Sequence, residues 1–263
     1  MSQRVAAVAR YELGGEEYGM FGAPAMHAFG ARRHMAKYGT TKEQLGSISL
    51  AFREHALRNP EAQMKKTLTM DDYLSAPLIV EPFGMLDCSL RSDAAGAVIV
   101  TSAERAKDLR HSPVLISGFG TFNNLRGWFY DDHMLTTAAA PSSQKAYKMA
   151  GIGPKDVDTF HVYDCFTYMV LAQLEDYGFC AKGEGGEFAA SGALGLDGQL
   201  PTNTAGGQLS ESHCEGMLQI VEAVRQVRHD YGPDRQVKDA EVAVVSGHGG
   251  NTVCHSSLVL RRG

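Results

Sequence analysis

Apolar residues recur at helical spacing in several separate stretches of the chain. In the stretch 45–56 these apolar residues lie three or four positions apart, which predicts a helix. The polar residues 40–43 predict a capping box at the start of this helix, and Asn59-Pro60 predicts its end. Thr69, followed by Asp72, predicts a second helix start. Further helices are predicted over residues 103–109, 142–150, 166–174 and 217–227.

Runs rich in β-branched residues predict the strands. They cover residues 4–10, 92–101, 114–119, 159–162, 241–246 and 257–260. The runs 92–101 and 114–119 show little polar alternation, which is typical of strands covered on both faces. Strands that alternate with helices predict an α/β fold with a largely parallel sheet covered by helices. A glycine-rich connection is predicted over 181–198, and a soft boundary near His111 divides the chain into domains 1–110 and 111–263.

Composition and charge narrow the class of protein. With 263 residues, 44% hydrophobic and 21% charged, the chain resembles ordinary globular proteins and can bury a core. The net charge of −5 offers no basic surplus for a phosphate backbone, so we expect no nucleic-acid partner. No apolar run reaches membrane-spanning length and the N-terminus lacks a secretory cleavage site, so we expect a cytoplasmic protein with no membrane partner.

The cysteines favour reduced, buried thiols over a disulfide framework or a structural zinc site, because their number is odd, they are scattered and they form no CxxC pair. They are Cys88, Cys165, Cys180, Cys214 and Cys254. Asp131, Asp132 and His133 could hold a metal ion, but a solvated loop is the stronger interpretation. We therefore expect neither a metal nor a tightly bound cofactor.

The first of three polar motifs lies where the strand 159–162 passes into a helix. It contains Tyr163 and Asp164, and a strand-to-helix corner presents such side chains toward a cleft. The alternative is that Asp164 or Thr167 caps the helix and that Tyr163 is a packed aromatic residue.

The second motif, residues 201–213, precedes the long predicted helix. Its Gly206-Gly207 pair, next to Asn203, would let backbone approach a ligand closely. His213 could donate a hydrogen bond to a developing oxyanion or move a proton near neutral pH. The alternative is a solvated histidine in a polar loop.

The third motif, residues 246–252, joins the last two strands. A tight hairpin would explain its glycines, but it would not explain His248. Since all three motifs fall at strand ends, we expect Tyr163, His213 and His248 to converge on one pocket as catalytic residues. The predicted substrate-binding residues are Asn203, Gly206, Gly207, Ser246, Gly249 and Gly250. The GxSxG, GxxxxGK[ST] and HExxH patterns do not occur in the sequence.

Together the motifs YDCF, GEGG, NTAGGQLSESHCEG and SGHGGN, in this order, resemble the thiolase superfamily. The most similar branch contains sterol-carrier-protein-x thiolases, lipid-transfer-like proteins and steroid side-chain aldolases. The resemblance also includes HMAKYGTTKEQLG, NPEAQM, LTMDDYL and LDCSLRSDAAGAVIVTSAERA. It implies a thiolase-like layered fold of mixed sheets covered by helices, with an incomplete N-terminal half. The loop of the nucleophilic cysteine has no counterpart before Met1, which is expected of a truncated gene product, a start site assigned too late, or one half of a split protein.

The resemblance also assigns roles to individual residues. His213 occupies the place of the oxyanion-hole histidine of thiolases, Tyr163 that of an asparagine, and Ser246 falls near the second catalytic cysteine. Cys88 lies in a structural segment of the family and is no replacement nucleophile. Because a thiol is needed to carry an acyl group, ordinary thiolysis is disfavoured.

The function implied is carbon–carbon cleavage of retro-aldol type on a steroid or other bulky β-hydroxyacyl-CoA, in lipid or steroid degradation, with the coenzyme A thioester as substrate. Tyr163 and His213 would transfer protons, and His248 with the amides of Gly249 and Gly250 would hold the thioester oxygen. Related aldolases use a tyrosine where this chain has His213. Two alternatives stay open: a Claisen-type acetyl-CoA acyltransferase whose nucleophile lies on a missing segment, and a non-catalytic carrier of lipid or acyl-CoA. The resemblance further implies a homodimer and a small OB-fold, zinc-ribbon partner protein.

Overall fold

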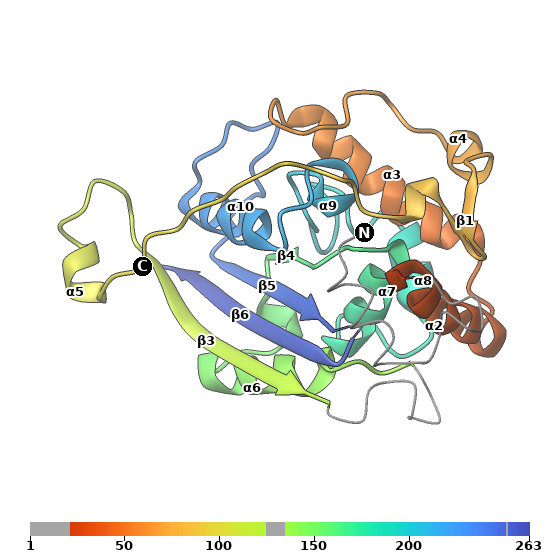
Figure 1. The fold of residues 1–263 in the computed structure, drawn as a ribbon. Coiled ribbons are helices and arrows are strands. Elements are labelled where there is room, and N and C mark those ends of the chain that lie inside the picture. The colour runs from red at the N-terminus through yellow and green to blue at the C-terminus, as the bar shows by residue number, and fades with distance from the viewer. Residues whose placement is uncertain (1–21, 125–134, 251) are drawn as a thin grey trace, which may run out of the picture.

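A four-stranded mixed sheet forms the centre of the structure, a computed structural model that describes residues 22–124, 135–250 and 252–263 (Figure 1). The strand predicted over residues 4–10 and the loop 131–133 lie outside these ranges. In spatial order the strands are β3 (Val114–Asn123), β6 (Cys254–Arg262), β5 (Val242–Gly249) and β4 (Thr159–His161).

The pairing of the strands differs from the prediction. Only β4 and β5 run parallel, whereas β6 is antiparallel to both β5 and β3. The prediction of a largely parallel sheet is therefore wrong. The reason is local: a short turn joins β5 to β6, and two strands joined so closely can pair only as an antiparallel hairpin. The layered, mixed α/β fold implied by the family resemblance is confirmed.

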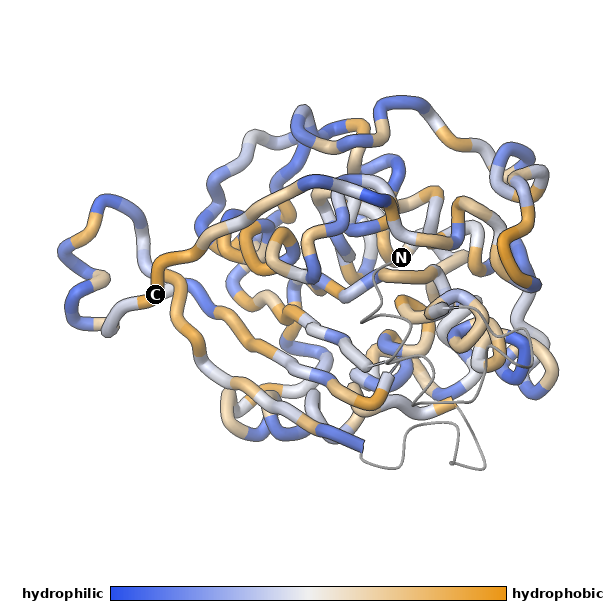
Figure 2. The backbone as a smooth tube through the Cα atoms, in the orientation of Figure 1, coloured by the Kyte–Doolittle hydropathy of each residue, from blue (hydrophilic) through white to orange (hydrophobic). Residues whose placement is uncertain are grey.

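Helices cover both faces of this sheet. Helix α6 (Ala139–Ala150) packs on β3 and β6, and α10 (Met217–Arg228) packs on β4, β5 and β6. Alternate residues of β5 serve the two sides: Val244 belongs to the large core cluster, and its neighbours Ala243 and Val245 belong to the α10 cluster. Figure 2 shows apolar residues along the strands and polar ones on the outer loop around α5 (Ala103–Ala106).

A layer of helices beside the sheet completes the core. Helix α7 (Thr167–Asp176) is buried on all sides, and α3 (Lys42–Arg58) packs against α7, α8 (Gly185–Ala190) and α9 (Gly207–Ser210). One core cluster includes residues from both sides of the predicted boundary at His111, and that boundary stays a prediction. The other elements are α2 (Gly22–Tyr38), α4 (Met70–Leu74), β1 (Leu78–Val80), β2 (Phe83–Gly84) and the 3-10 helices Met85–Asp87 and Pro154–Asp156.

Most predicted helices and strands are found, with small shifts at their ends. The capping box of α3 is formed by Thr41 and Gln44, one residue later than predicted, because Thr41 has the extended backbone of an N-cap. Thr69 is the N-cap of helix α4, and its side chain accepts a hydrogen bond from the backbone N–H of its predicted partner Asp72. The predicted connection 181–198 contains the short helix α8.

The run 92–101 is not a strand, and this prediction is wrong. Ile99 is 93% exposed and Val100 is 72% exposed. β-Branched residues favour strands, but a strand also needs a neighbour for its backbone hydrogen bonds, and none pairs with this run among the described residues. The run 114–119 does form a strand, but at the edge of the sheet with Ile116 and Phe119 exposed, so it is not covered on both faces. None of the helices placed by the structure could cross a membrane.

Candidate functional site

The strand-to-helix corner between β4 and α7 holds Tyr163 by its backbone. The N–H of Tyr163 donates to Oγ of Ser246 at 2.8 Å, and its carbonyl accepts from Nε2 of Gln173 at 2.9 Å. Ser246 in turn donates to Oε1 of Gln173 at 2.6 Å. Ser246 is 1% exposed, so its hydroxyl braces this corner from within the protein.

Asp164 connects the corner to the second motif. Its buried carboxylate accepts hydrogen bonds from the backbone N–H groups of Gln208 and Leu209, at 2.9 and 3.1 Å, and from Nε2 of Gln219 at 3.1 Å. Burial raises its pKa to about 6, against the opposing effect of these donors. Asp164 therefore binds the start of α9, whereas the alternative prediction made it or Thr167 the cap of α7, which begins after Phe166 without a side-chain cap.

Asn203, Gly206 and Gly207 also serve this corner. Nδ2 of Asn203 donates to the carbonyl of Val162 at 2.9 Å. Gly206 and Gly207 have φ angles of 111° and 60°, and a Cβ on Gly207 would lie 2.3 Å from Oδ2 of Asp164. In this structure the glycine pair therefore lets the backbone pack closely against the Asp164 side chain, rather than against a ligand.

Beyond the corner, the Tyr163 ring faces His213 and Glu215. Its hydroxyl donates to Oε2 of Glu215 at 3.0 Å and lies 3.4 Å from Nε2 of His213. Burial raises the pKa of Tyr163 well above its usual value, and the neighbouring Cys165 and Glu215 raise it further. Tyr163 is therefore a neutral phenol that donates a hydrogen bond.

His213 is held from its other side. Nδ1 lies 3.2 Å from Oγ of Ser89, and its backbone N–H donates to Oγ of Ser92 at 3.0 Å. The His213 side chain is 24% exposed and that of Glu215 is 84% exposed, whereas Tyr163 is 6% exposed. This side of the site therefore opens toward solvent past Glu215, while the phenol ring is buried.

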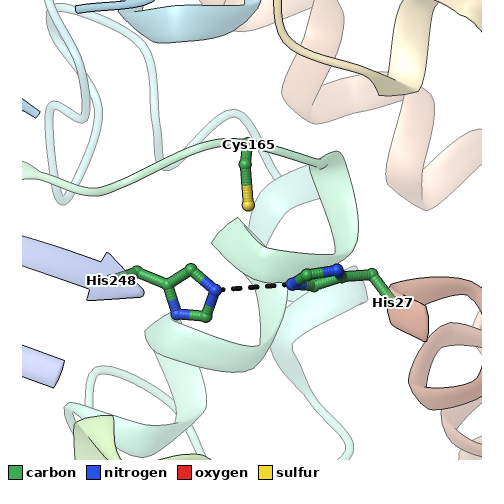
Figure 3. Close-up of side chains that lie close together, drawn as sticks. All are labelled: His27, Cys165 and His248. Carbon is green, nitrogen blue, oxygen red and sulfur yellow. Dashed lines mark hydrogen bonds between the residues drawn. The ribbon is translucent and has the colours of Figure 1, made fainter. Parts of the chain in front are cut away.

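The His248 ring also lies next to the Tyr163 ring, with 5.5 Å between the ring centroids. Its Nε2 lies 3.4 Å from Nε2 of His27, whose Nδ1 is 2.8 Å from the carbonyl oxygen of Ala23 (Figure 3). Burial lowers the pKa of His27 to about 4 and that of His248 well below its usual value. Both imidazoles are therefore neutral, and the buried Cys165 thiol beside them has a raised pKa.

These contacts assign a tautomer to each imidazole. A carbonyl oxygen accepts only, so Nδ1 of His27 carries the proton and its Nε2 carries the lone pair. Nε2–H of His248 then donates to His27, which leaves Nδ1 of His248 as an acceptor without a partner in the described part of the chain. In this tautomer His248 has no second N–H for an oxyanion.

The structure brings the three predicted catalytic residues together, because Tyr163 lies next to both His213 and His248. Of the six predicted substrate-binding residues, four form the scaffold described above: Asn203, Gly206, Gly207 and Ser246. The other two lie at the end of the last hairpin: Gly249 ends β5, and Gly250 lies in the exposed turn after it.

Sequence reasoning missed four neighbours of the site. Glu215 follows His213 by two positions in the same motif, so a wider reading of that motif would have found it. The contact of His27 with His248 spans 221 residues, and no local pattern signals it. Ser89 and Cys165 also line the cluster, although Cys165 had been interpreted only as a buried thiol.

Comparison with known proteins places this site in a family. Residues 124–262, which include Tyr163, His213 and His248, match the thiolase C-terminal domain-like family. The chain belongs to the thiolase family. A thiolase-family relative, the steroid side-chain-cleaving aldolase of Thermomonospora curvata, is 43% identical over 75% of this chain and 52% of its own length. The acetyl-CoA acetyltransferase of Methanothermobacter thermautotrophicus is 35% identical over 88% of this chain and 62% of its own length.

The same family membership appears in three dimensions. The solved Ltp2-ChsH2(DUF35) aldolase superimposes with a TM-score of 0.89 at 34% identity, covering 100% of this chain and 69% of that one. The predicted resemblance to steroid side-chain aldolases within the thiolase superfamily is confirmed. This thiolase-family chain spans about half to two thirds of the length of the curated relatives it matches.

Proposed function

We propose that the protein containing this chain cleaves a carbon–carbon bond of a β-hydroxyacyl-CoA by a retro-aldol reaction, in which His213 transfers the proton and Tyr163 donates a hydrogen bond. The observation that carries the proposal is the phenol–imidazole pair, with 3.4 Å between the Tyr163 oxygen and Nε2 of His213. Such a pair can remove and return a proton, which is what a retro-aldol reaction requires.

In the proposed reaction, Nε2 of His213 takes the proton of the substrate's β-hydroxyl group. The β-carbon becomes a carbonyl carbon, the bond between the α- and β-carbons breaks, and its electron pair passes into the enolate of the thioester. The imidazolium then returns the proton to the α-carbon. The products are a ketone or aldehyde and a shortened acyl-CoA, and no redox partner is consumed.

Tyr163 supplies a hydrogen bond in this scheme and does not act as the base. Its raised pKa keeps the phenol protonated, and its O–H already points at an acceptor, Glu215. A substrate oxygen that displaced Glu215 would accept the same hydrogen bond as charge develops on it. We propose His248 and the amides of Gly249 and Gly250 as further contacts of the thioester oxygen. His248 would then change to the tautomer that carries its proton on Nδ1 and give up its hydrogen bond to His27.

A Claisen-type acyltransferase is the second candidate, favoured by the 35% identity to an acetyl-CoA acetyltransferase. It needs a thiolate nucleophile, since the acyl group is carried covalently. Ser246, which falls near the second thiolase cysteine, is buried and binds Gln173 and the backbone of Tyr163, so it does not supply one. The candidate thus depends on a nucleophile from elsewhere, and the aldolase proposal does not.

The finer proposals rest on the named relatives. A steroid or other bulky acyl group is proposed because the 43% identical relative is a steroid side-chain-cleaving aldolase. A small OB-fold, zinc-ribbon partner is proposed because the superimposed aldolase is named as an assembly of Ltp2 with ChsH2(DUF35). We further propose a homodimer and a cytoplasmic location, and coenzyme A as part of the substrate with no tightly bound organic cofactor.

Dependence on free coenzyme A separates the two reactions. A steroid β-hydroxyacyl-CoA and the matching β-ketoacyl-CoA are each incubated with the full-length protein and its partner, with and without free coenzyme A, and the acyl-CoA products are quantified. Retro-aldol cleavage consumes the β-hydroxy substrate without free coenzyme A. Cleavage of the β-keto substrate alone, with an absolute need for free coenzyme A, would instead identify a thiolase reaction.

A further inference from the structure

Three potential metal ligands meet at the buried side of the candidate site. The side chains come from three separate segments: His27 from α2, Cys165 from the loop before α7, and His248 from β5. Their ligand atoms all lie within 4.8 Å of one another. Figure 3 shows the Cys165 sulfur pointing toward the space between the two imidazole rings.

The spacing is close to that of a tetrahedral zinc site. Zinc–nitrogen and zinc–sulfur bonds of about 2.0 and 2.3 Å place two nitrogens about 3.3 Å apart and a nitrogen and a sulfur about 3.6 Å apart. The two Nε2 atoms are already 3.4 Å apart. The sulfur lies no more than 4.8 Å from either nitrogen, so it must approach each by about 1.2 Å at most, through a rotation of the Cys165 side chain.

The outer contact of His27 is also the one that zinc-binding histidines make. A ligating imidazole donates its second N–H to a carboxylate or a backbone carbonyl, which orients the ring and leaves the other nitrogen's lone pair for the metal. Nδ1 of His27 makes this contact with Ala23, in the same helix, at 2.8 Å. The lone pair of its Nε2 therefore points toward His248 and the space beside Cys165.

We propose that His27, Cys165 and His248 form a binding site for a divalent transition-metal ion, most favourably Zn²⁺. Two imidazoles and one thiolate are ligands that zinc accepts, and three protein ligands leave one tetrahedral position open. On binding, the Cys165 thiol releases its proton to solvent and both Nε2 atoms present lone pairs. This proposal departs from the sequence-based expectation of no metal. The sequence does not reveal the site because His27 and His248 are 221 residues apart.

The fourth position is available to water or to an oxygen of a bound molecule. Two neutral imidazoles and one thiolate leave a bound Zn²⁺ with one net positive charge, so an anionic oxygen is the favoured fourth ligand. The Tyr163 ring lies next to the site, with its centroid 5.5 Å from that of His248. The metal proposal stands independently of the proposed retro-aldol activity, since it concerns binding alone.

Cobalt binding tests the proposal directly on the wild-type protein. The metal-free protein is titrated with Co²⁺ and then with Zn²⁺, and the spectrum is recorded. We expect about one equivalent of Co²⁺ to bind, with the thiolate-to-cobalt charge-transfer absorption and tetrahedral d–d bands that a Cys-containing site gives, and Zn²⁺ to displace it. No saturable binding, or binding without a charge-transfer absorption, would overturn the proposal.

Matched variants assign the ligands. Cys165→Ser removes the thiolate at nearly constant volume and should abolish the charge-transfer absorption; His27→Ala should weaken Zn²⁺ binding by more than the roughly 10–100-fold that loss of an outer contact costs. The controls are Cys180→Ser and the exposed His111→Gln, which should bind as the wild type does. Equal binding by Cys165→Ser and wild type, or a loss as large in the controls, would also overturn it. Far-UV circular dichroism identifies any variant that fails to fold, and the wild-type titration decides in that case.

Discussion

The phenol oxygen of Tyr163 and Nε2 of His213 lie 3.4 Å apart, although 50 residues separate them in the sequence. Two buried side chains, Ser246 and Asp164, hold the segments that carry this pair. Ser246 fixes the backbone of Tyr163, and Asp164 binds the start of α9, the short helix just before His213. The geometry of the pair is thus set by buried hydrogen bonds, so changes at these supports should affect activity as well as stability.

Glu215 tests whether the acceptor of the Tyr163 hydroxyl matters. Glu215→Ala removes the acceptor that orients the phenol before a substrate oxygen displaces it, so we expect kcat/KM for cleavage to fall by about tenfold. Glu215→Gln keeps an acceptor oxygen and should retain most of the rate. The measurement is steady-state kinetics on the β-hydroxyacyl-CoA, and equal rates in the alanine variant and wild type would show that Glu215 does not orient the phenol.

Gly207 tests the packing of the corner. In Gly207→Ala the new Cβ would lie 2.3 Å from Oδ2 of Asp164 at a φ of 60°, so we expect a loss of about 3 kcal/mol in the free energy of unfolding. Gly192→Ala is the matched control: its φ is 86°, but no atom lies within 4 Å of the new Cβ, so about 1 kcal/mol is expected. Urea unfolding measures both. A Gly207 loss no larger than that of Gly192 would contradict the close packing.

Glu211 should make the stability depend on pH. Burial and the nearby Glu222 raise the pKa of its carboxyl group from its usual 4.5 to about 8. The folded state then binds the extra proton between these values, so its contribution to stability is complete below pH 4.5 and is lost as the pH rises toward 8.

Glu211→Gln removes this titration while keeping an oxygen that can accept from Asn59. Relative to wild type, the variant should gain on the order of 2 kcal/mol in the free energy of unfolding between pH 5 and pH 8. The exposed Glu187→Gln is the control and should show no such gain. Parallel stability curves for Glu211→Gln and wild type would refute the raised pKa.

Local patterns in the sequence were enough to predict most of the elements and the three motifs of the site. The helix starts at Thr41 and Thr69 and the αL glycine that ends α6, Gly151, are local features, and each appears within a residue of its predicted place. Tyr163 follows the end of β4, His213 lies in the loop between α9 and α10, and His248 lies at the end of β5, where residues distant in sequence meet.

The features that the sequence could not show depend on contacts between residues far apart in the chain. The run 92–101 has the composition of a strand, but composition does not reveal whether a neighbour is present to pair with it. The scaffolding roles of Asn203, Gly207 and Ser246 were also hidden, because small polar residues and glycines serve a ligand or a buried corner equally well. His27 could enter the site only through the packing of α2.

The most direct test is the single-turnover rate of cleavage of a steroid β-hydroxyacyl-CoA by Tyr163→Phe and His213→Ala, measured with the thioester's dissociation constant. Losing a proton-transfer group such as His213, or a hydrogen-bond donor to a developing charge such as Tyr163, costs about 100-fold or more, so we expect both rates to fall by at least that factor while binding changes little. Wild-type rates in both variants would contradict the assignment of Tyr163 and His213 as the catalytic pair.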